Sequence, residues 1–243
     1  MTGVQTCALP ILTPAHQFPL GVALHPSRRR QVVDWAAASG ALVIEDDYDG
    51  EFRYDRQAVG ALQSLAPEHV AYAGTASKSL VPGLRLGWLV LPARLIDDVV
   101  AAKATALRLG SSLDQLALAE FIASGGYDRQ VRRARLGYRQ RRDRLVAELT
   151  RRAPAVKVTG IAAGLHAVVT LPADLTEAGA VAAAARRGLA VQGLSALSAT
   201  AAGSRVDVRD APSHDPALVV GYATPPGHAF TTAVARLSAV LRG

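Results

Sequence analysis

Two apolar runs of strand length, each followed at once by a polar cluster, constrain this chain more than any other feature. The run Ala41–Ile44 leads into EDDYD (45–49), and the run Val70–Ala73 leads into GTASKSL (74–80). A helical pattern that begins at Pro26 and ends at Gly40 precedes the first run. Strand and helix therefore alternate as in a doubly wound α/β sheet. Because ligands of such sheets lie beyond the carboxyl ends of the strands, we expect the two polar clusters to share a site.

Lys78 is the most unusual residue of the second cluster. The chain has three lysines against 24 arginines, so a lysine at this place runs against the composition. Lys78 also lies between two predicted buried strands, Val70–Ala73 and Leu84–Leu91. An amine in such a place is suited to Schiff-base chemistry if its surroundings lower the cost of the neutral form. The alternative is a solvated loop lysine.

Three blocks of sequence carry a resemblance to a known family. They are TPAHQFPLG (13–21), IEDDYDGEFRYD (44–55) and GTASKSLVPGLRLGWLVLP (74–92). Together they resemble the fold type I pyridoxal-phosphate (PLP) enzymes, the aspartate aminotransferase superfamily, and more closely the aminotransferase-like domain of MocR-type regulators of the GntR family. The resemblance extends from Leu12 onward. It implies an α/β fold: a partial large domain with a mainly parallel sheet and flanking helices, then a C-terminal α+β small domain.

The resemblance also implies a cofactor, PLP, and a role for six residues. Lys78 forms the internal aldimine. Asp46 keeps the pyridine nitrogen protonated, which makes the ring an electron sink, with Asp47 as the other possible register. Tyr48 lies two positions after Asp46, so both point to one side of an extended strand end, and Tyr48 reaches the phenolic oxygen of the cofactor. The phosphate is expected to contact two hydroxyls and a bidentate guanidinium, from Thr75, Ser77 and Arg85. Taken singly, Asp46 is also typical of a strand-end turn and Arg85 of a surface ion pair.

Two positions depart from the aminotransferase pattern. Aminotransferases hold the substrate carboxylate with an arginine near the start of the last small-domain strand, and LVVGY (218–222) contains none. Arg205 or Arg209, in a polar segment expected to be a mobile loop (199–216), is the available substitute. In the loop 14–21, Phe18 stands before Pro19 where aminotransferases have asparagine, which leaves His16 and Gln17 as polar substitutes or as solvated loop residues.

The domain organisation is expected to have three parts. Residues 1–11 resemble the translation of a sequencing adapter, so the natural protein is expected to begin upstream and this chain to be a fragment. Residues 12–125 are the partial PLP-binding large domain, and 126–243 a long linking helix and the small domain. Setting residues 1–11 aside removes Cys7, the only cysteine, which fits a reducing cytoplasm. No run reaches the roughly 18 apolar residues of a membrane span.

Local patterns predict the remaining elements. Two helices are expected between Pro92 and Ser124, the second starting with a cap signal from Ser112 and Gln115. In the small domain, strands are expected at 164–171, 189–191 and 218–223, and helices at 177–187 and 227–242.

The predicted helix 127–152 carries eight arginines on one face, and the net charge is +7. A nucleic-acid helix is one interpretation, because arginines neutralise phosphates. The other is the solvated face of a helix that joins two domains, which is the one we favour. The eight are Arg129, Arg132, Arg133, Arg135, Arg139, Arg141, Arg142 and Arg144.

The sequence therefore predicts a PLP-binding effector domain of a MocR-type transcriptional regulator that senses PLP or an amino-acid ligand. The resemblance implies a homodimer, and DNA binding through an N-terminal winged helix-turn-helix that nothing in 12–243 resembles. The alternative is a fragment of a free-standing class I/II aminotransferase. A cytoplasmic location without membrane partners is expected for either.

Overall fold

The computed structural model describes residues 9–54, 59–106, 111–197 and 214–242. They form two compact units. The first unit holds the described residues up to Gln17 together with Val22–Ala134, and the second holds Phe18–Gly21 and the residues from Arg135 onward. Helix α4 (Gly126–Arg152) belongs to both, because the division falls inside it. The division expected from the sequence, between residues 125 and 126, assigns all of α4 to the C-terminal part.

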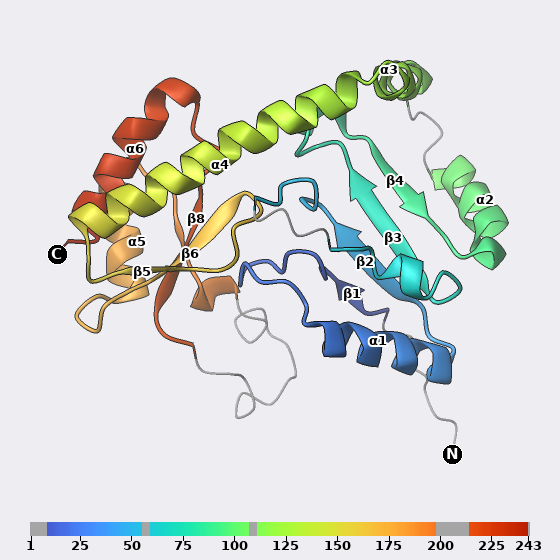
Figure 1. Cartoon of the computed structure of the whole chain (residues 1–243), viewed down its shortest axis with the longest axis horizontal. Helices are drawn as coiled ribbons and strands as arrows, with labels where there is room; N and C mark the ends of the chain where they lie inside the picture. The colour runs from blue at the N-terminus through green and yellow to red at the C-terminus, as the bar shows by residue number, and fades with distance from the viewer. Residues whose placement is uncertain (1–8, 55–58, 107–110, 198–213, 243) are drawn as a thin grey trace. The chain divides into compact units, whose positions relative to one another are not determined.

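The first unit is built on a sheet of four strands, with the order β1-β2-β3-β4 (Figure 1). The first three strands are parallel and β4 is antiparallel to β3. The mainly parallel sheet predicted from the sequence is therefore confirmed. The strands are β1 (Ile11–Leu12), β2 (Val43–Asp47), β3 (Val70–Thr75) and β4 (Gly87–Val90).

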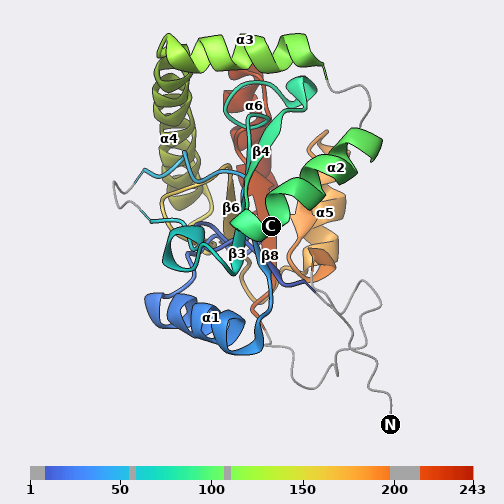
Figure 2. The same cartoon turned by 90° about the vertical axis from the view of Figure 1, so that its right-hand side faces the viewer.

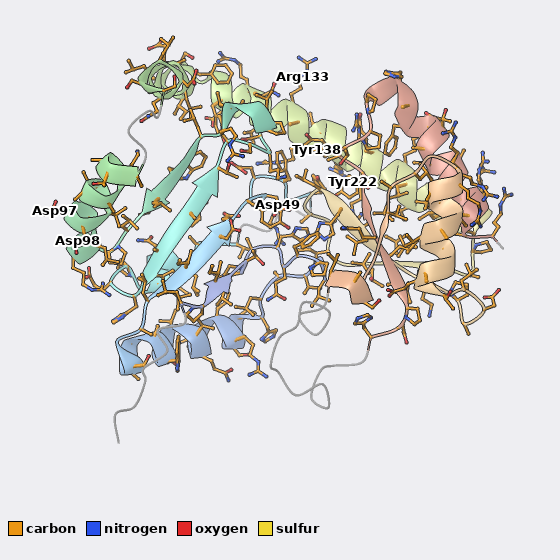
Figure 3. The ribbon with its side chains drawn as sticks, turned by 180° about the vertical axis from the view of Figure 1, so that it is seen from behind. Asp49, Asp97, Asp98, Arg133, Tyr138 and Tyr222 are labelled. Carbon is orange, nitrogen blue, oxygen red and sulfur yellow. The ribbon has the colours of Figure 1, made fainter. Side chains whose placement is uncertain are left out.

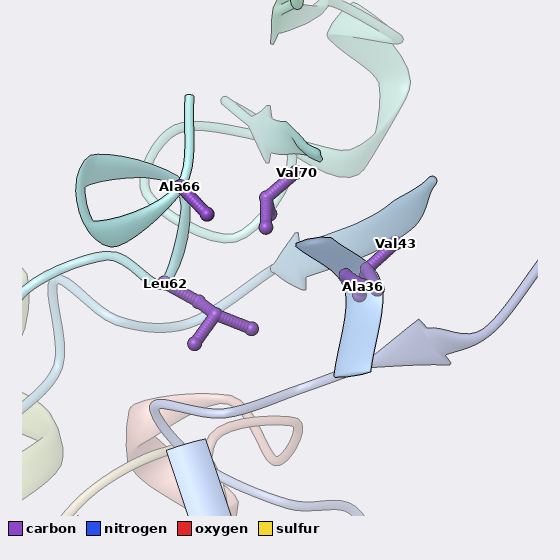
Figure 4. Packing of buried hydrophobic residues seen from close by; sticks show 5 residues of the cluster. All are labelled: Ala36, Val43, Leu62, Ala66 and Val70. Carbon is purple, nitrogen blue, oxygen red and sulfur yellow. The ribbon is translucent and has the colours of Figure 1, made fainter. Parts of the chain in front are cut away.

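Helix α1 (Pro26–Ser39) starts on a proline and ends where Gly40 adopts φ +67°. Because a left-handed residue favours glycine, Gly40 explains the stop. Helix α1 packs on the sheet through a cluster of small and branched side chains (Figure 4). The cluster comprises Ala36, Val43, Leu62, Ala66 and Val70, with Leu12, Val32 and Val33 against it.

The remaining helices of the first unit include α2 (Ile96–Ala106) and α3 (Ser112–Ala123). The expected cap was one residue too late: Ser111, not Ser112, is the N-cap, and its side chain accepts a hydrogen bond from the Asp114 N–H. The chain turns sharply between α3 and α4 at Gly125, which has φ +70° (Figure 2). Short 3₁₀ turns lie at Gln63–Leu65, Pro82–Leu84 and Ala93–Leu95.

The second unit has an antiparallel sheet with the order β5-β6-β8-β7. With helices α5 (Glu177–Arg186) and α6 (Gly227–Val240) it forms the predicted α+β arrangement. The strand expected at 189–191 is wrong, because pairing occurs one step later, at Gln192–Gly193. The strands are β5 (Lys157–Thr159), β6 (His166–Thr170), β7 (Gln192–Gly193) and β8 (Ala217–Gly221), followed after β7 by the turn Ser195–Leu197.

Buried polar groups of the second unit are tied to its backbone. The Tyr222 hydroxyl lies 3.0 Å from the Ala163 carbonyl oxygen and 2.6 Å from that of Gly164. Arg141 donates from Nη1 to the carbonyl oxygens of Ala223 and Pro225, both at 2.8 Å. Arg141 therefore does not belong to the solvated face predicted for α4. Among the described residues, no helix combines the length and the apolar character that a membrane crossing requires.

Candidate functional site

The three acids at the end of β2 have different environments, because successive side chains of a strand point to opposite faces. Buried Glu45 accepts hydrogen bonds from the N–H groups of Leu62 (2.8 Å) and Gln63 (2.9 Å). Asp47, on the same face, accepts bonds from the Tyr72 hydroxyl and the Gly50 N–H, both at 2.9 Å. Both side chains therefore help to hold the fold.

Asp46 lies between these two acids and points to the other face. It is half-buried, and within the described residues no group donates a hydrogen bond to it. Burial raises the pKa of its carboxyl group, and the charges of Asp47 and Asp49 raise this pKa further. The Asp46 carboxylate would therefore be stabilised by a cationic N–H donor. This difference favours Asp46 over Asp47 as the acid available to a ligand.

Tyr48 and Asp49 continue the cluster beyond β2. The Tyr48 hydroxyl is buried and makes no hydrogen bond of ordinary length and angle with the described residues. Burial raises its pKa, and the neighbouring Asp49 carboxylate raises this pKa further. Asp49 is buried, with its Oδ2 2.8 Å from Nδ1 of buried His16. The interpretation of His16 as a solvated loop residue is therefore wrong.

The last residue of β3 and the loop from β3 to β4 carry the four other predicted site residues. Its ends are fixed by the pairing of Thr75 with Gly87 and by a 3.0 Å bond from the Ala76 N–H to the Leu86 carbonyl oxygen. Inside it, Thr75 Oγ1 donates to Ser77 Oγ at 3.0 Å and accepts from the Ser77 N–H at 3.1 Å. The two hydroxyls predicted to contact a phosphate are therefore neighbours.

Arg85 has φ +53°, and among the described residues it is the only non-glycine with a positive φ. Such a backbone costs free energy and is concentrated at ligand-binding positions. Lys78 and Arg85 are both exposed. Neither forms a hydrogen bond or an ion pair with any described part of the chain. Their charges are available to a ligand.

The strand register brings these residues to one edge of the sheet. Asp46 pairs with Ala73 and Asp47 with Gly74, so the end of β2 lies beside the end of β3, where Thr75 is the last strand residue before the loop. The donor set fits PLP: a carboxylate without a partner for a pyridine N–H, a buried phenol, an amine, two adjacent hydroxyls and a guanidinium. The described residues include no group of three or more histidines, cysteines or acids able to hold a metal ion.

Other predictions concern a substrate carboxylate and nucleic acid. Strand β8 contains no arginine, and Arg205 and Arg209 lie outside the described residues, as does most of the expected mobile loop.

On α4, Arg133 points outward (Figure 3), whereas Arg139 and Arg142 lie within 4 Å of the Asp143 carboxylate. Nucleic-acid binding by this helix stays the untested alternative to the solvated face that we favour.

One group near Lys78 was not predicted. Tyr127, at the start of α4, donates to Glu51 Oε1 at 2.8 Å and lies 2.8 Å from Oγ of Ser79, the residue after Lys78. These partners are 76 and 48 positions away in the sequence. No local pattern could have revealed them.

Comparison with known protein families identifies the relatives of the chain. Residues 11–211 match the family model for aminotransferase class I and II. The chain belongs to this family. The family and its structural neighbours depend on PLP.

Among curated relatives, the chain is similar to the HTH-type transcriptional regulator YhdI of Bacillus subtilis. The two are 37% identical over 73% of this chain and 38% of that protein. It is also similar to the HTH-type pyridoxine biosynthesis transcriptional regulator PdxR of Corynebacterium glutamicum, with 36% identity over 76% of this chain and 40% of that one. The aminotransferase-like domain is therefore related to MocR-type regulators, and the chain spans less than half the length of these two relatives.

Among solved structures, the chain is similar to LysN, an α-aminoadipate aminotransferase from Thermus thermophilus complexed with N-(5'-phosphopyridoxyl)-L-leucine. The TM-score is 0.80 and the identity 25%, over 97% of this chain and 59% of LysN. The fold type I aminotransferase fold predicted from the sequence is confirmed.

Proposed function

We propose that this chain is the PLP-binding, aminotransferase-like effector domain of a MocR/GntR-type transcriptional regulator, and that it senses PLP or an amino-acid ligand bound to it. The observation that carries the proposal is the carboxylate of Asp46. It is half-buried, repelled by two neighbouring acids, and has no hydrogen-bond donor among the described residues, while it lies beside the loop that bears Lys78.

Each site residue has a specific task in this proposal. Asp46 holds a proton on the pyridine nitrogen, and Tyr48 donates its hydroxyl to the phenolic oxygen. Thr75, Ser77 and Arg85 bind the phosphate, the arginine by a charge-assisted fork. When bound, PLP would supply an aldehyde to the Lys78 amine and a ring that accepts electrons.

In the whole protein, we propose that the response reaches DNA through an N-terminal winged helix-turn-helix and that the domain forms a homodimer in the cytoplasm. The relationship to HTH-type regulators supports this, as does PdxR, which is named for pyridoxine biosynthesis.

The test is a titration of the full chain with PLP, followed by visible absorbance and by borohydride reduction with peptide mass mapping. We expect a stable PLP adduct on the peptide that contains Lys78. Lys78→Ala should lose the adduct and the absorbance band, whereas Lys103→Ala, on exposed helix α2, should keep both. Equal labelling of the Lys78→Ala and wild-type chains would refute the assignment of Lys78.

The second candidate function is transamination, as a piece of a free-standing class I/II aminotransferase, and the fold shared with LysN favours it. Half-reactions of the PLP-loaded chain with a panel of amino acids separate the two. Formation of pyridoxamine phosphate would support the enzyme. Ligand-dependent spectral change without pyridoxamine phosphate would support the sensor.

A further inference from the structure

The hydroxyl of Tyr127 joins two segments that are remote in sequence. It lies 2.8 Å from Ser79 Oγ and donates to Glu51 Oε1 at 2.8 Å, all within the first unit. Ser79 is 1% exposed and directly follows Lys78. The turn that contains both is closed by a 2.9 Å bond from the Leu80 N–H to the Ala76 carbonyl oxygen. A movement of the Lys78 turn therefore alters the Ser79–Tyr127 contact.

The number of protons on the three side chains fixes which group donates in each of the two hydrogen bonds. A phenol has one proton, and Tyr127 gives it to the carboxylate of Glu51, so Ser79 must donate to Tyr127. Burial raises the pKa of Tyr127 to about 12, so its proton is retained at neutral pH. The order Ser79 to Tyr127 to Glu51 is therefore fixed while Glu51 is ionised.

The position of Tyr127 is fixed by the junction between α3 and α4. Gly125 has φ +70°, and Gly126 is buried against the ring of Phe121, which lies 2.3 Å from where a Cβ would be. A side chain at position 126 would therefore displace the Phe121 ring from the start of α4. Tyr127 follows Gly126 directly, in the first turn of the helix.

We propose that Tyr127 is a positioning residue for Lys78. It acts through Ser79, and it couples the state of the Lys78 turn to the first turns of helix α4. The proposal rests on the proposed attachment of PLP to Lys78. It states how a change at Lys78 reaches residues outside the loop. Because α4 continues into the second unit, its first turns are a connection by which the regulator can respond.

The experiment compares Tyr127→Phe, Glu51→Leu and Glu51→Gln with the wild-type chain. Two quantities are measured: the Kd for PLP by absorbance, and amide exchange of residues 76–80 and 126–134 with and without PLP. We expect PLP to slow exchange at 126–134 in the wild type. Tyr127→Phe and Glu51→Leu should each weaken PLP binding about tenfold, as for the loss of one hydrogen bond to a charged group, and abolish the slowing.

Rescue and additivity separate positioning from general damage. Glu51→Gln keeps an oxygen acceptor and should retain nearly wild-type affinity. The double variant Tyr127→Phe with Glu51→Leu should be no weaker than Tyr127→Phe alone, because Tyr127→Phe already removes the Tyr127–Glu51 bond. Additive losses would overturn the proposal, as would wild-type PLP affinity in Tyr127→Phe.

The matched control is Tyr222→Phe, which removes a buried hydroxyl from the second unit and should leave exchange at 76–80 and PLP affinity unchanged. If Tyr127→Phe does not fold, Ser79→Ala breaks the same contact from the other side, with the same expected results. If the wild-type chain does not take up PLP, the proposed function fails. Positioning is then read from exchange at 76–80 without PLP, which Tyr127→Phe should accelerate about tenfold; no acceleration would overturn it.

Discussion

The buried polar groups of the two units are used in different ways. In the second unit, Tyr222 and Arg141 are bonded to backbone carbonyl oxygens, and Ser238 donates to the Val234 carbonyl oxygen at 2.8 Å. In the first unit, Asp46 and Tyr48 have no such bond with the described residues. Folded proteins pair almost all buried polar groups, because an unpaired one destabilises the fold. The second unit therefore uses these polar groups for folding, whereas in the first we expect Asp46 and Tyr48 to serve a ligand.

The same contrast appears in the carboxyl groups. Burial raises the pKa of Glu45, Asp46 and Glu51 in the first unit. In the second unit, burial alone would raise the pKa of Glu177, but hydrogen bonds from the Ala217 N–H and from Ser195 bring it below the ordinary value. The charged form is therefore disfavoured at Glu45, Asp46 and Glu51 and favoured at Glu177.

The largest effect is expected at Glu45. Glu45→Ala leaves the N–H groups of Leu62 and Gln63 without acceptors in a buried site and should reduce the free energy of unfolding of the first unit by about 3 kcal/mol. Segment-resolved amide exchange measures this change. The control Glu45→Gln keeps one acceptor oxygen and should lose about half as much. A loss below about 1 kcal/mol would show that the first unit does not depend on this bonding.

The next effect is expected at Tyr222. Tyr222→Phe removes the donor shared by the carbonyl oxygens of Ala163 and Gly164, and the second unit should lose about 2 kcal/mol. Denaturant unfolding followed by exchange at β6 and β8 measures it. An equal change in the exchange of the first unit would mean that the two units unfold together. Their stabilities could then not be compared separately.

A smaller effect is expected from pH, with opposite signs in the two units. A raised pKa means that the folded first unit binds more protons than the unfolded chain, so its stability should fall as pH rises above about 4. The lowered pKa of Glu177 gives stability that is present above its ordinary value of 4.5 and lost as pH falls below it. Amide exchange from pH 3 to 7, corrected for intrinsic rates, should show the two trends. Parallel trends would contradict the pKa directions.

The smallest effect on stability is expected at Asp46. Asp46→Asn removes a repelled charge and breaks no bond with the described residues, so unfolding should change by less than about 0.5 kcal/mol. PLP affinity should nevertheless fall. Asp47→Asn is the control: it disturbs the contacts with Tyr72 and Gly50, so it should reduce stability by about 1 kcal/mol. The reverse pattern would transfer the role in cofactor binding to Asp47.

Local sequence patterns predicted most elements of the fold. The apolar runs before EDDYD and GTASKSL lead into strands β2 and β3, and β2 continues through Asp47. Pro26 and Gly40 bound helix α1, because strand periodicity and helix stops are local signals. The direction of β4 could not be predicted, since the run Leu84–Leu91 does not encode which way it pairs. Its first residues form a turn instead of a strand.

The candidate site was predictable in its residue types but not in its supports. The family resemblance implied the carboxylate, amine and guanidinium, and the structure places them at the ends of adjacent strands, where their roles stay predictions. The hydrogen bonds between Leu62 and Glu45 and between Ser79 and Tyr127 join residues 17 and 48 positions apart. Such contacts depend on tertiary packing. The identity of the N-cap, Ser111 and not Ser112, likewise depends on the residue at which the helical backbone begins, and the local pattern does not fix this residue.

The backbone at Arg85 has a consequence for engineering. A side chain at φ +53° lowers the stability of the loop, and glycine would relieve the strain at that position. A selection for heat resistance alone would therefore enrich Arg85→Gly. The resulting variants would be more thermostable but would have lost the guanidinium. Thermal screening of this domain should therefore be accompanied by a measurement of phosphate affinity.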